Sequence, residues 1–330
     1  MADVARLAGV STATVSRVLN GGRVAPHTQR KVERAIAILG YRPNTLARSL
    51  ATGRTGVIGV VIPDVAGTLY SQMARGIEDV LLQNEMNFMM MTGNRDPELE
   101  RAAIELFLER RVDGLILIGS GLQHEPLASL VGDGLPVVLM EREGPEERYP
   151  TIFLDNRAGA VAATRYLLSQ GHRRIAHVAG IRRAGQLRLE GFLETLREAG
   201  VEPGPILQGD FSEESGWRAG ERLLQEEGVT AVFCANDRMA LGFYGLLSSR
   251  RIHIPDQISV VGFDDLPWGA YVSPPLTTVR QPARDMGRLA AQLMVRILAG
   301  EEVPLRTAVC PQLVVRGSVR RLDGAEPAAP

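Results

Sequence analysis

Cations near the N-terminus are the first residues of this sequence whose type and spacing could do chemistry. Residues 1–55 contain nine basic side chains against two acidic ones, Asp3 and Glu33, so this segment carries a net charge of +7. The basic residues are Arg6, Arg17, Arg23, Arg30, Lys31, Arg34, Arg42, Arg48 and Arg54. The whole chain carries -1, which leaves about -8 for the remainder. A short cationic segment can neutralise phosphates, whereas the acidic remainder repels DNA. We therefore expect a polyanion to bind the N-terminal segment; a merely solvated surface is the alternative.

Signatures of catalysis are scarce in the sequence. It contains no GxxxxGKS/T phosphate-binding loop, no GxGxxG after a strand, no GxSxG and no HExxH, and its five histidines lack metal-ligand spacing. Asp264–Asp265 could act as a general acid and base, but no nucleophile or metal motif lies beside them. Gly119–Ser120–Gly121 has no third glycine and is interpreted as a turn. We therefore expect no catalytic residue, no metal and no cofactor.

The elements that would position these residues begin with three short helical patterns. The first has one apolar face and ends at Gly9, and Ser11 is placed to cap a second helix over residues 12–19. The third begins near Pro26 and ends at Gly40. Two short helices joined by a tight turn are typical of a helix-turn-helix.

The next segment has an apolar pair, Leu46 and Leu50, four residues apart. A helix this short does not form alone in water, because nucleation costs more free energy than so few hydrogen bonds return. It therefore needs a partner. Residues 52–56, with two glycines, are interpreted as a linker.

From Gly56 onward, apolar runs alternate with amphipathic segments. The runs are residues 57–62, 88–91, 115–118, 137–140, 152–154, 175–179, 231–234 and 259–263. Near-continuous apolar strands separated by helices indicate parallel sheets covered on both faces. Eight strands are too many for one core, so we expect two doubly wound lobes with a ligand at the carboxyl ends of the strands.

Membrane insertion and secretion are not expected. No apolar run approaches the roughly 18 residues that a membrane span needs, and the N-terminus lacks the basic-then-apolar layout of a secretory signal. The only cysteines, Cys234 and Cys310, form no CxxC pair. A reducing cytoplasm fits best.

Residues 3–20, DVARLAGVSTATVSRVLN, closely resemble the helix-turn-helix of the LacI/GalR family of regulators. The likeness continues through LGYRPN and LARSL, which resemble the family's hinge helix. RVDGLI, GHRRIA, AVFCAND and VGFDD are similar to parts of its sensor domain. The resemblance implies an all-α helix-turn-helix head plus an α/β sensor like periplasmic binding proteins, with two doubly wound parallel-sheet lobes.

The resemblance also implies domain bounds. The head is placed at residues 1–42, the hinge helix and linker at 43–55, the ligand-binding domain at 56–320 and a disordered tail at 321–330. Lobe 1 would comprise residues 56–155 and 282–310, and lobe 2 residues 156–281 and 311–320.

For DNA, the resemblance implies a homodimer on a palindromic double-stranded operator, with a tetramer as the alternative assembly. Thr12, Ala13 and Arg17 would face base edges, and the fork of Arg17 matches guanine. The residues expected to hold phosphates and set register are Ser11, Ser16, Asn20, Thr28 and Tyr41. The alternatives are a phosphate contact for Arg17 and a plain exposed helix for Thr12 and Ala13.

The paired hinge helices would lie in the minor groove, where the resemblance places Asn44, Ala47 and Leu50. Leu50 would wedge between the central base steps, and the few kcal/mol per unstacked step would be offset by buried apolar surface. A segment ordered only by its partner and DNA can also act as a switch. The alternative is that Leu50 packs against the head.

For the sensor, the family's pocket positions carry over one by one to Leu69, Tyr70, Glu141, Arg182, Arg188, Phe211, Asn236 and Asp264. An aromatic face, an arginine and a carboxylate suit a polyhydroxylated ligand. A sugar or sugar acid is the first expectation and a nucleobase or nucleoside the second. Alternatively, Phe211 belongs to the core, Arg188 and Asp264 form a structural pair, and Arg182 is a surface residue.

Capping residues depart from the family pattern at two helices. The chain starts almost at Asp3, so either its start is misassigned or the first helix is weakly capped. Ala25 replaces a usual serine before the third helix, which removes a cap of roughly 1 kcal/mol. Asp237 is expected to cap the helix that follows it.

These observations predict a DNA-binding transcriptional regulator, a repressor, whose operator affinity is changed by a small-molecule effector in the cleft between the lobes. Two other functions remain open: a solute-binding protein without a role at DNA, and an enzyme acting on a sugar. The sequence leaves open whether the effector releases the protein from DNA or drives it on.

Overall fold

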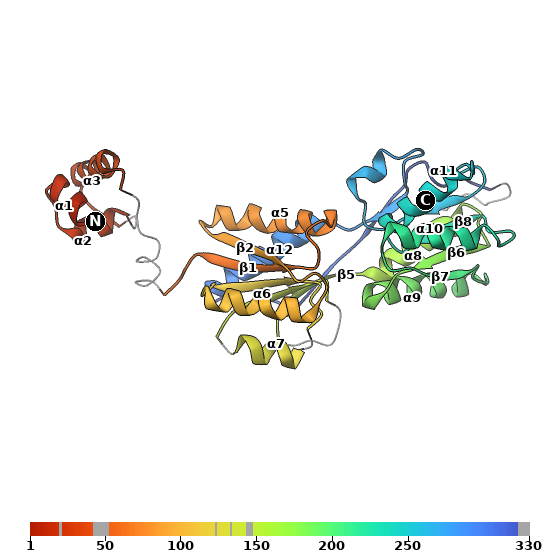
Figure 1. Cartoon of the computed structure of the whole chain (residues 1–330), viewed down its shortest axis with the longest axis horizontal. Helices are drawn as coiled ribbons and strands as arrows, with labels where there is room; N and C mark the ends of the chain where they lie inside the picture. The colour runs from red at the N-terminus through yellow and green to blue at the C-terminus, as the bar shows by residue number, and fades with distance from the viewer. Residues whose placement is uncertain (20–21, 42–52, 123, 133, 143–147, 323–330) are drawn as a thin grey trace. The chain divides into compact units, whose positions relative to one another are not determined.

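The computed structural model describes residues 1–19, 22–41, 53–122, 124–132, 134–142 and 148–322. The chain divides into two compact units, Met1–Gly56 with Arg111–Asp113, and Val57–Arg110 with Gly114–Pro330 (Figure 1). In the described part of the chain, no helix combines the length and apolarity needed to cross a membrane.

The described residues of the N-terminal unit form three helices, α1 (Ala2–Ala8), α2 (Thr12–Leu19) and α3 (Pro26–Leu39). Its core consists of Val4, Ala5, Ala8, Val15, Val32 and Ala35. Gly9 (φ 66°) ends α1 and Gly40 (φ 56°) ends α3 in the left-handed conformation that glycine adopts without steric cost. The Ser11 hydroxyl accepts a hydrogen bond from the Thr14 amide (3.1 Å), which confirms the predicted cap of α2.

The other two helices start without a side-chain cap. Met1 precedes α1 and Ala25 precedes α3, and neither side chain accepts a hydrogen bond from the first turn. Pro26 partly offsets this at α3, because it has no amide hydrogen to satisfy and its fixed φ suits the first turn.

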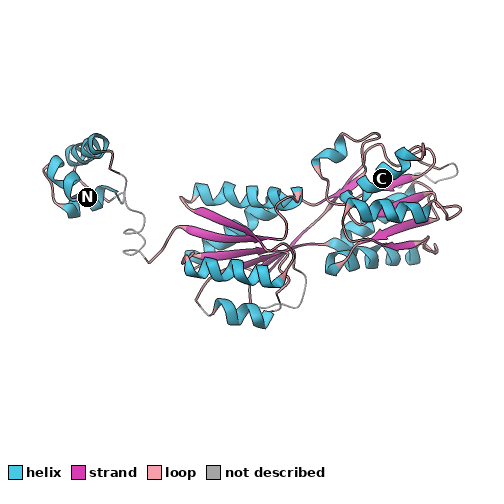
Figure 2. Cartoon of the chain, in the orientation of Figure 1, coloured by secondary structure: helices cyan, strands magenta, loops and turns pink. Residues whose placement is uncertain are grey.

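The first lobe of the larger unit is built on a six-stranded parallel sheet, in the order β11-β5-β4-β3-β1-β2. The strands are β1 (Val57–Ile62), β2 (Asn87–Thr92), β3 (Gly114–Ile118), β4 (Val137–Met140), β5 (Thr151–Leu154) and β11 (Arg306–Val309). The helices are α5 (Thr68–Gln83), α6 (Pro97–Glu109), α7 (His124–Val131) and α12 (Ala283–Leu298). They cover both faces of the sheet (Figure 2).

Helices α5 and α12 pack closely because each carries a glycine at the crossing. A Cβ atom on Gly76 would lie 2.0 Å from the Arg284 carbonyl oxygen, and one on Gly287 would lie 2.0 Å from that of Met73. A larger residue at either position would push the two helices apart.

The second lobe is built on a four-stranded parallel sheet, in the order β7-β6-β8-β9. Its strands are β6 (Ile175–Ala179), β7 (Ile206–Gln208), β8 (Ala231–Cys234) and β9 (Ser259–Val261). Its helices are α8 (Asn156–Ser169), α9 (Arg182–Glu198), α10 (Glu213–Leu223), α11 (Asp237–Ser249) and the short 3-10 helix η1 (Pro267–Ala270). β10 (Thr278–Arg280) and β12 (Gln312–Val314) form an antiparallel pair.

All eight predicted strands are present, although the last ends at Val261 rather than at residue 263. The sequence interpretation missed β7, β10, β11 and β12. Three of these, β7, β11 and β12, have half-buried and exposed residues rather than continuous apolar runs.

The prediction that Asp237 caps α11 is wrong. Asn236 has the extended backbone of an N-cap, and its Oδ1 accepts the Met239 amide hydrogen bond (2.9 Å). The Asp237 carboxylate instead accepts hydrogen bonds from the Thr278 hydroxyl (2.6 Å) and the Leu266 amide (2.8 Å). Asp237 is fully buried, so its carboxylate joins three segments of the second lobe rather than one helix end.

Two buried histidines lie in the second lobe. The His177 ring lies 4.9 Å from those of Phe192 and Phe233 and donates from Nδ1 to the Phe233 carbonyl (2.8 Å). His172 contacts the Thr230 hydroxyl (2.9 Å). Burial lowers the pKa of His177 to about 3 and that of His172 to about 4. Both imidazoles are therefore neutral in the folded protein at neutral pH.

We expect these histidines to destabilise the protein in acid. Below the ordinary histidine pKa of about 6.5, the unfolded chain binds protons that the folded chain does not. Each of these histidines therefore lowers the free energy of unfolding by about 1.4 kcal/mol for every pH unit by which the pH decreases. His177→Phe keeps the ring stack and should reduce this slope by that amount between about pH 6 and pH 4, measured by urea unfolding. The exposed His253 supplies the control, His253→Gln, which should leave the slope unchanged. An unchanged slope in His177→Phe would contradict the prediction.

Candidate functional site

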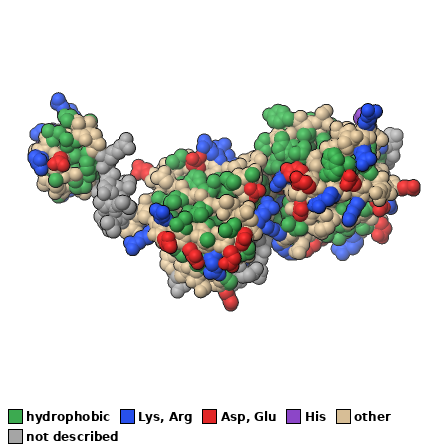
Figure 3. Space-filling model, in the orientation of Figure 1, with side chains coloured by type: hydrophobic (Ala, Val, Ile, Leu, Met, Phe, Trp, Pro, Cys, Tyr) green, Lys and Arg blue, Asp and Glu red, His purple; other side chains and the backbone are tan. Residues whose placement is uncertain are grey.

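One face of α2 holds the N-terminal unit together and the opposite face is free. Val15 is fully buried in the three-helix core, whereas Thr12, Ala13 and Arg17 are exposed. Lys and Arg side chains are also visible on the surface of this unit (Figure 3). Ala13 and Arg17 thus lie on the side of the second helix opposite Val15, and Thr12 is exposed as the first residue of that helix.

The residues predicted to contact phosphates are less uniform. Ser11 is exposed, but its hydroxyl already caps α2 and lies 2.9 Å from the Thr14 hydroxyl. Ser16 and Thr28 are half-buried, and Tyr41 packs against the three-helix core. Asn20, Asn44, Ala47 and Leu50 lie outside the described residues, and so does most of the predicted tail.

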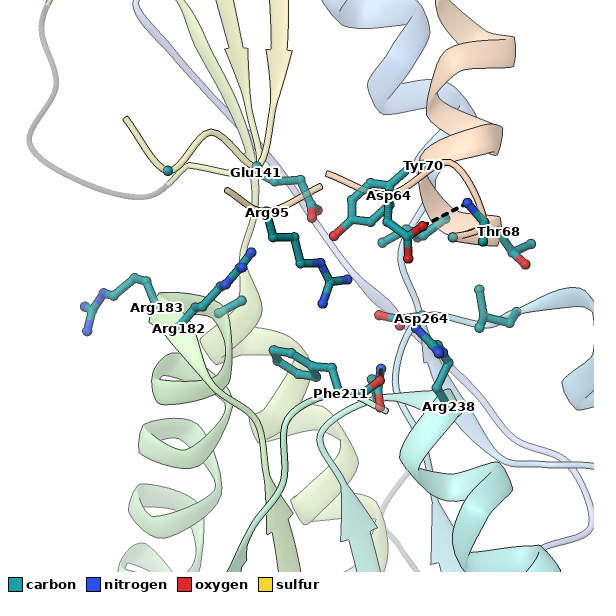
Figure 4. Close-up of a pocket in the computed structure, with 18 of the residues that line it drawn as sticks. Asp64, Thr68, Tyr70, Arg95, Glu141, Arg182, Arg183, Phe211, Arg238 and Asp264 are labelled. Atoms are coloured by element: carbon teal, nitrogen blue, oxygen red, sulfur yellow. Dashed lines mark hydrogen bonds between the residues drawn. The ribbon is translucent and has the colours of Figure 1, made fainter. Parts of the chain in front are cut away.

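The larger unit contains a pocket of about 640 Å³ lined by both lobes (Figure 4). This volume lies in the usual range for small-molecule sites, about 300–1,000 Å³. All eight predicted effector residues line it: Leu69, Tyr70, Glu141, Arg182, Arg188, Phe211, Asn236 and Asp264. Most follow a strand or begin a helix, because the carboxyl ends of the parallel strands of both sheets meet the pocket.

Arg188 is the buried cation of the pocket, with 5% of its surface exposed. Its Nε donates to Asn156 Oδ1 (2.8 Å), its Nη1 donates to the Ala235 carbonyl, and Nη1 lies 3.5 Å from Asp264 Oδ1. Its guanidinium carbon lies 3.6 Å from the centre of the Phe263 ring. The structural pair of Arg188 and Asp264, one of the sequence alternatives, is therefore present, and both residues still line the pocket.

Carboxylates and a phenol crowd the same pocket. Burial raises the pKa of Asp264 to about 7, with a smaller raising contribution from Glu141, while the charge of Arg188 opposes the shift. Burial, and secondly the charge of Glu141, raise the pKa of Tyr70 to about 12. Gln281 donates a hydrogen bond to Glu141 Oε1. The pocket therefore offers hydroxyl-binding carboxyl groups beside an aromatic ring.

Several pocket residues have strained backbones. Glu141 (φ 57°), Arg182 (φ 64°), Phe211 (φ 71°) and Asp264 (φ 120°) lie at positive φ, where side chains are rarely tolerated. Such residues cost about 1–3 kcal/mol each and cluster at ligand sites. Four of the eight predicted effector residues share this property, which marks the pocket as a functional site.

The sequence interpretation missed other residues that line this pocket. Asp64 and Arg95 follow β1 and β2, and Trp268 lies in η1. Arg238 makes two hydrogen bonds to Glu213, of 2.7 and 2.6 Å. These residues lie just after strands or near the starts of helices, and that position was the sequence signal that could have identified them as pocket residues. Among the described residues, no group of three His, Cys, Asp or Glu side chains could hold a metal ion.

Comparisons with known proteins agree with this arrangement. Residues 1–44 match the family described as bacterial regulatory proteins, lacI family, and residues 164–319 match the periplasmic binding protein-like domain. Catabolite control protein A of Priestia megaterium is 36% identical over 310 residues, covering 91% of this chain and 93% of that protein. The transcriptional repressor CytR of Escherichia coli strain K12 is 35% identical over 331 residues, covering 98% and 96%.

Solved structures share the whole architecture. The Lac repressor dimer bound to operator and the anti-inducer ONPF has a TM-score of 0.85 and 30% identity, covering 96% of this chain and 98% of that chain. The transcriptional regulator CelR in complex with cellobiose has a TM-score of 0.73 and 36% identity, with the same coverage.

A helix-turn-helix and a two-lobed sensor with a pocket define a DNA-binding transcriptional regulator that responds to a small-molecule effector. The chain belongs to the LacI family of bacterial regulatory proteins.

Removing Arg188 should destabilise the second lobe strongly. Arg188→Leu leaves the buried Asp264 carboxylate without its cation and two buried oxygens without a donor, so we expect a loss of about 3–5 kcal/mol in the free energy of unfolding. Asp264→Asn should cost less, on the order of 1–2 kcal/mol, because Arg188 keeps its hydrogen bonds to Asn156 and Ala235 and the new amide oxygen can still accept from it. Both tryptophans, Trp217 and Trp268, lie in the second lobe, so their fluorescence in urea reports its unfolding. Equal losses in the two variants would show that Arg188 does not compensate a buried charge.

Proposed function

We propose that this chain is a homodimeric, ligand-responsive repressor of transcription that works in the cytoplasm and catalyses no reaction. In this proposal the head spans residues 1–42, the hinge and linker 43–55, and the ligand-binding domain 56–320, with the lobe bounds inferred from the sequence. One observation carries it: a helix-turn-helix with an exposed reading face and a pocket lined by all eight expected effector residues occur in one chain. The family membership argues against the two other functions considered, a solute-binding protein and a sugar-acting enzyme.

At the operator, Thr12, Ala13 and Arg17 would face base edges from α2. All three are exposed, and Ala13 and Arg17 lie on the side of the helix opposite Val15, which supports this role. Ser11, Ser16, Asn20, Thr28 and Tyr41 would set the register on phosphates. The hinge residues Asn44, Ala47 and Leu50 would lie in the minor groove, with Leu50 as the wedge. A similar structure, the Lac repressor, is a dimer bound to operator, which supports operator binding by a dimer.

A homodimer is the assembly that we propose, with a tetramer as the alternative. Strand β2 is an open edge of the six-stranded sheet and carries exposed Met89 and Met90 (40% and 42% exposed), and Leu82 of α5 is 59% exposed. An open edge with exposed apolar side chains is typical of a protein interface.

For the effector we propose a sugar or sugar derivative. Tyr70 and Phe211 offer aromatic faces, and Glu141, Asn236 and Asp264 offer groups that bind hydroxyls. Two similar structures contain a sugar: CelR is in complex with cellobiose, and a LacI family regulator from Enterococcus faecium has bound ribose. A nucleobase or nucleoside remains the second candidate.

Operator selection tests the DNA-binding half of the proposal. Purified full-length protein, with its dimeric state checked by sedimentation, should enrich palindromes from random duplexes, and log affinity should fall linearly with log salt. Arg17→Ala should weaken binding to the selected palindrome roughly 5- to 150-fold, as expected for one guanine contact, and change random-duplex binding little. The exposed Arg34 of α3 provides the control: Arg34→Ala should leave the ratio of specific to non-specific affinity unchanged. No enrichment of any palindrome would reject the proposal.

A thermal-shift screen tests the effector half. Sugars, sugar acids and nucleosides are added to the full-length protein, and an effector at 100 times its Kd should stabilise the folded state by about 2.7 kcal/mol. The same compound should change affinity for the selected palindrome, which also reveals whether it releases or recruits the repressor. Phe211→Ala should abolish the stabilisation, whereas Trp217→Phe, on the exposed side of α10, should preserve it. A stabilising ligand without effect on DNA binding would argue against effector control.

A further inference from the structure

Arg95 and Arg182 occupy a special place in the pocket. Arg95 lies three residues after β2 in the first lobe, and Arg182 is the first residue of α9 in the second. Both side chains extend into the same space (Figure 4), and both also line a smaller adjoining cavity of about 240 Å³. Two cations supplied by different lobes therefore face one cavity.

These two cations lack the acidic partners that other pocket arginines have. Arg188 lies beside Asp264, and Arg238 pairs with Glu213. Within the part of the chain that the structure describes, no acidic oxygen lies within 4.0 Å of either the Arg95 or the Arg182 guanidinium. Both charges also act on the Tyr70 hydroxyl, lowering its pKa against the larger raising effects of burial and Glu141. Their fields therefore overlap within the pocket.

The local backbone adds to this positive field. Arg95 has φ 58° and Arg182 has φ 64°, so both residues are held in a conformation that side chains rarely adopt. Ile181 precedes α9, and its side chain cannot accept hydrogen bonds from the first-turn amides. Arg182 and Ala184 of this first turn line the pocket, so the positive end of a 17-residue helix adjoins the pocket that both guanidinium groups line.

Glu100 limits where a negative group can bind. Its carboxylate lines the smaller cavity, with Oε2 accepting the Gly121 amide hydrogen bond (2.9 Å) and Oε1 buried without a described partner. An anion deep in the smaller cavity would be repelled by this carboxylate. The favourable position for an anion is where the two cavities adjoin, beside Arg95 and Arg182, which line both.

We propose that the effector carries a carboxylate or phosphate group, which Arg95 and Arg182 bind between them at the start of α9. Guanidinium groups match the oxygens of both anions through paired hydrogen bonds. The hydroxyls of the same molecule face Glu141 and Asp264 on the other side of the pocket. This inference rests on the proposed sugar effector and narrows it to an anionic sugar, which would link the two lobes through its charged group.

The test compares neutral and anionic sugars of the same stereochemistry. Glucose, glucuronate and glucose 6-phosphate, with matching galactose and ribose sets, are titrated into the full-length protein by calorimetry. In at least one set we expect an anionic member to bind ten or more times more tightly than the neutral sugar, and its identity separates carboxylate from phosphate. Arg95→Gln and Arg182→Gln should each remove this preference. Arg197→Gln, the same charge change at the far end of α9, should retain it.

The outcomes separate this inference from the proposed function. A neutral sugar that binds as tightly as its anionic relatives and changes operator affinity would overturn the inference and leave the proposed function standing. Anion binding that persists in both glutamine variants would equally overturn it. Failure of every member of every set to bind would reject the anionic sugar, and the proposed repressor would then depend on the nucleoside arm of the thermal-shift screen.

Discussion

The burial of Arg188 is the constraint on which the geometry of the sensor depends. A guanidinium group removed from water must be matched by hydrogen-bond acceptors and negative charge. Here those groups come from three places: Asn156 at the start of α8, Ala235 after β8 and Asp264 after β9. Because one side chain contacts all three, the loops that form the floor of the pocket hold fixed positions relative to one another.

A second buried charge extends this network away from the pocket. Asp237 accepts hydrogen bonds from Leu266, two residues beyond Asp264, and from Thr278 of β10. Burial raises its pKa well above the ordinary value, and the nearby Asp264 adds to the shift. The segment 264–266 is therefore held by contacts of Asp264 with Arg188 and of Leu266 with Asp237, and Asp264 (φ 120°) and Asp265 (φ 58°) lie in it at positive φ.

Sequence patterns predicted the sheets well where burial is uniform. Strands such as β3 and β6 are buried at every residue, and each stands out as a continuous apolar run. Strand β11 lies at a sheet edge and β12 in a two-stranded pair, and neither contains a buried residue, so their residues resemble those of loops. At the start of α11, Asn236 and Asp237 were equally suitable caps by type. Only the buried partners of Asp237 decide between them, and these are distant in sequence.

Some pocket residues could likewise be predicted from the sequence around them, whereas others depend on residues distant in the sequence. Two of the eight predicted residues lie in stretches that resemble the family's sensor domain, Asn236 in AVFCAND and Asp264 in VGFDD. The other six lie outside those stretches and were predicted only by carrying over the family's pocket positions one by one. Arg95 lies in no such stretch, and its role depends on the side chain that faces it from the other lobe.

A last constraint concerns how the pocket relates to the linker. Within the N-terminal unit, the Asp113 carboxylate accepts hydrogen bonds from the amides of Thr55 and Gly56, each at 2.8 Å. Asp113 directly precedes β3, and β3 leads within a few residues to Gly119–Ser120–Gly121 on the pocket wall. The end of the linker is thus attached to the base of a strand whose other end meets the ligand site. Strand β1 connects the same two places through the chain itself, because it follows Gly56 directly and leads to Asp64 in the pocket lining, and it pairs with β3 along its length.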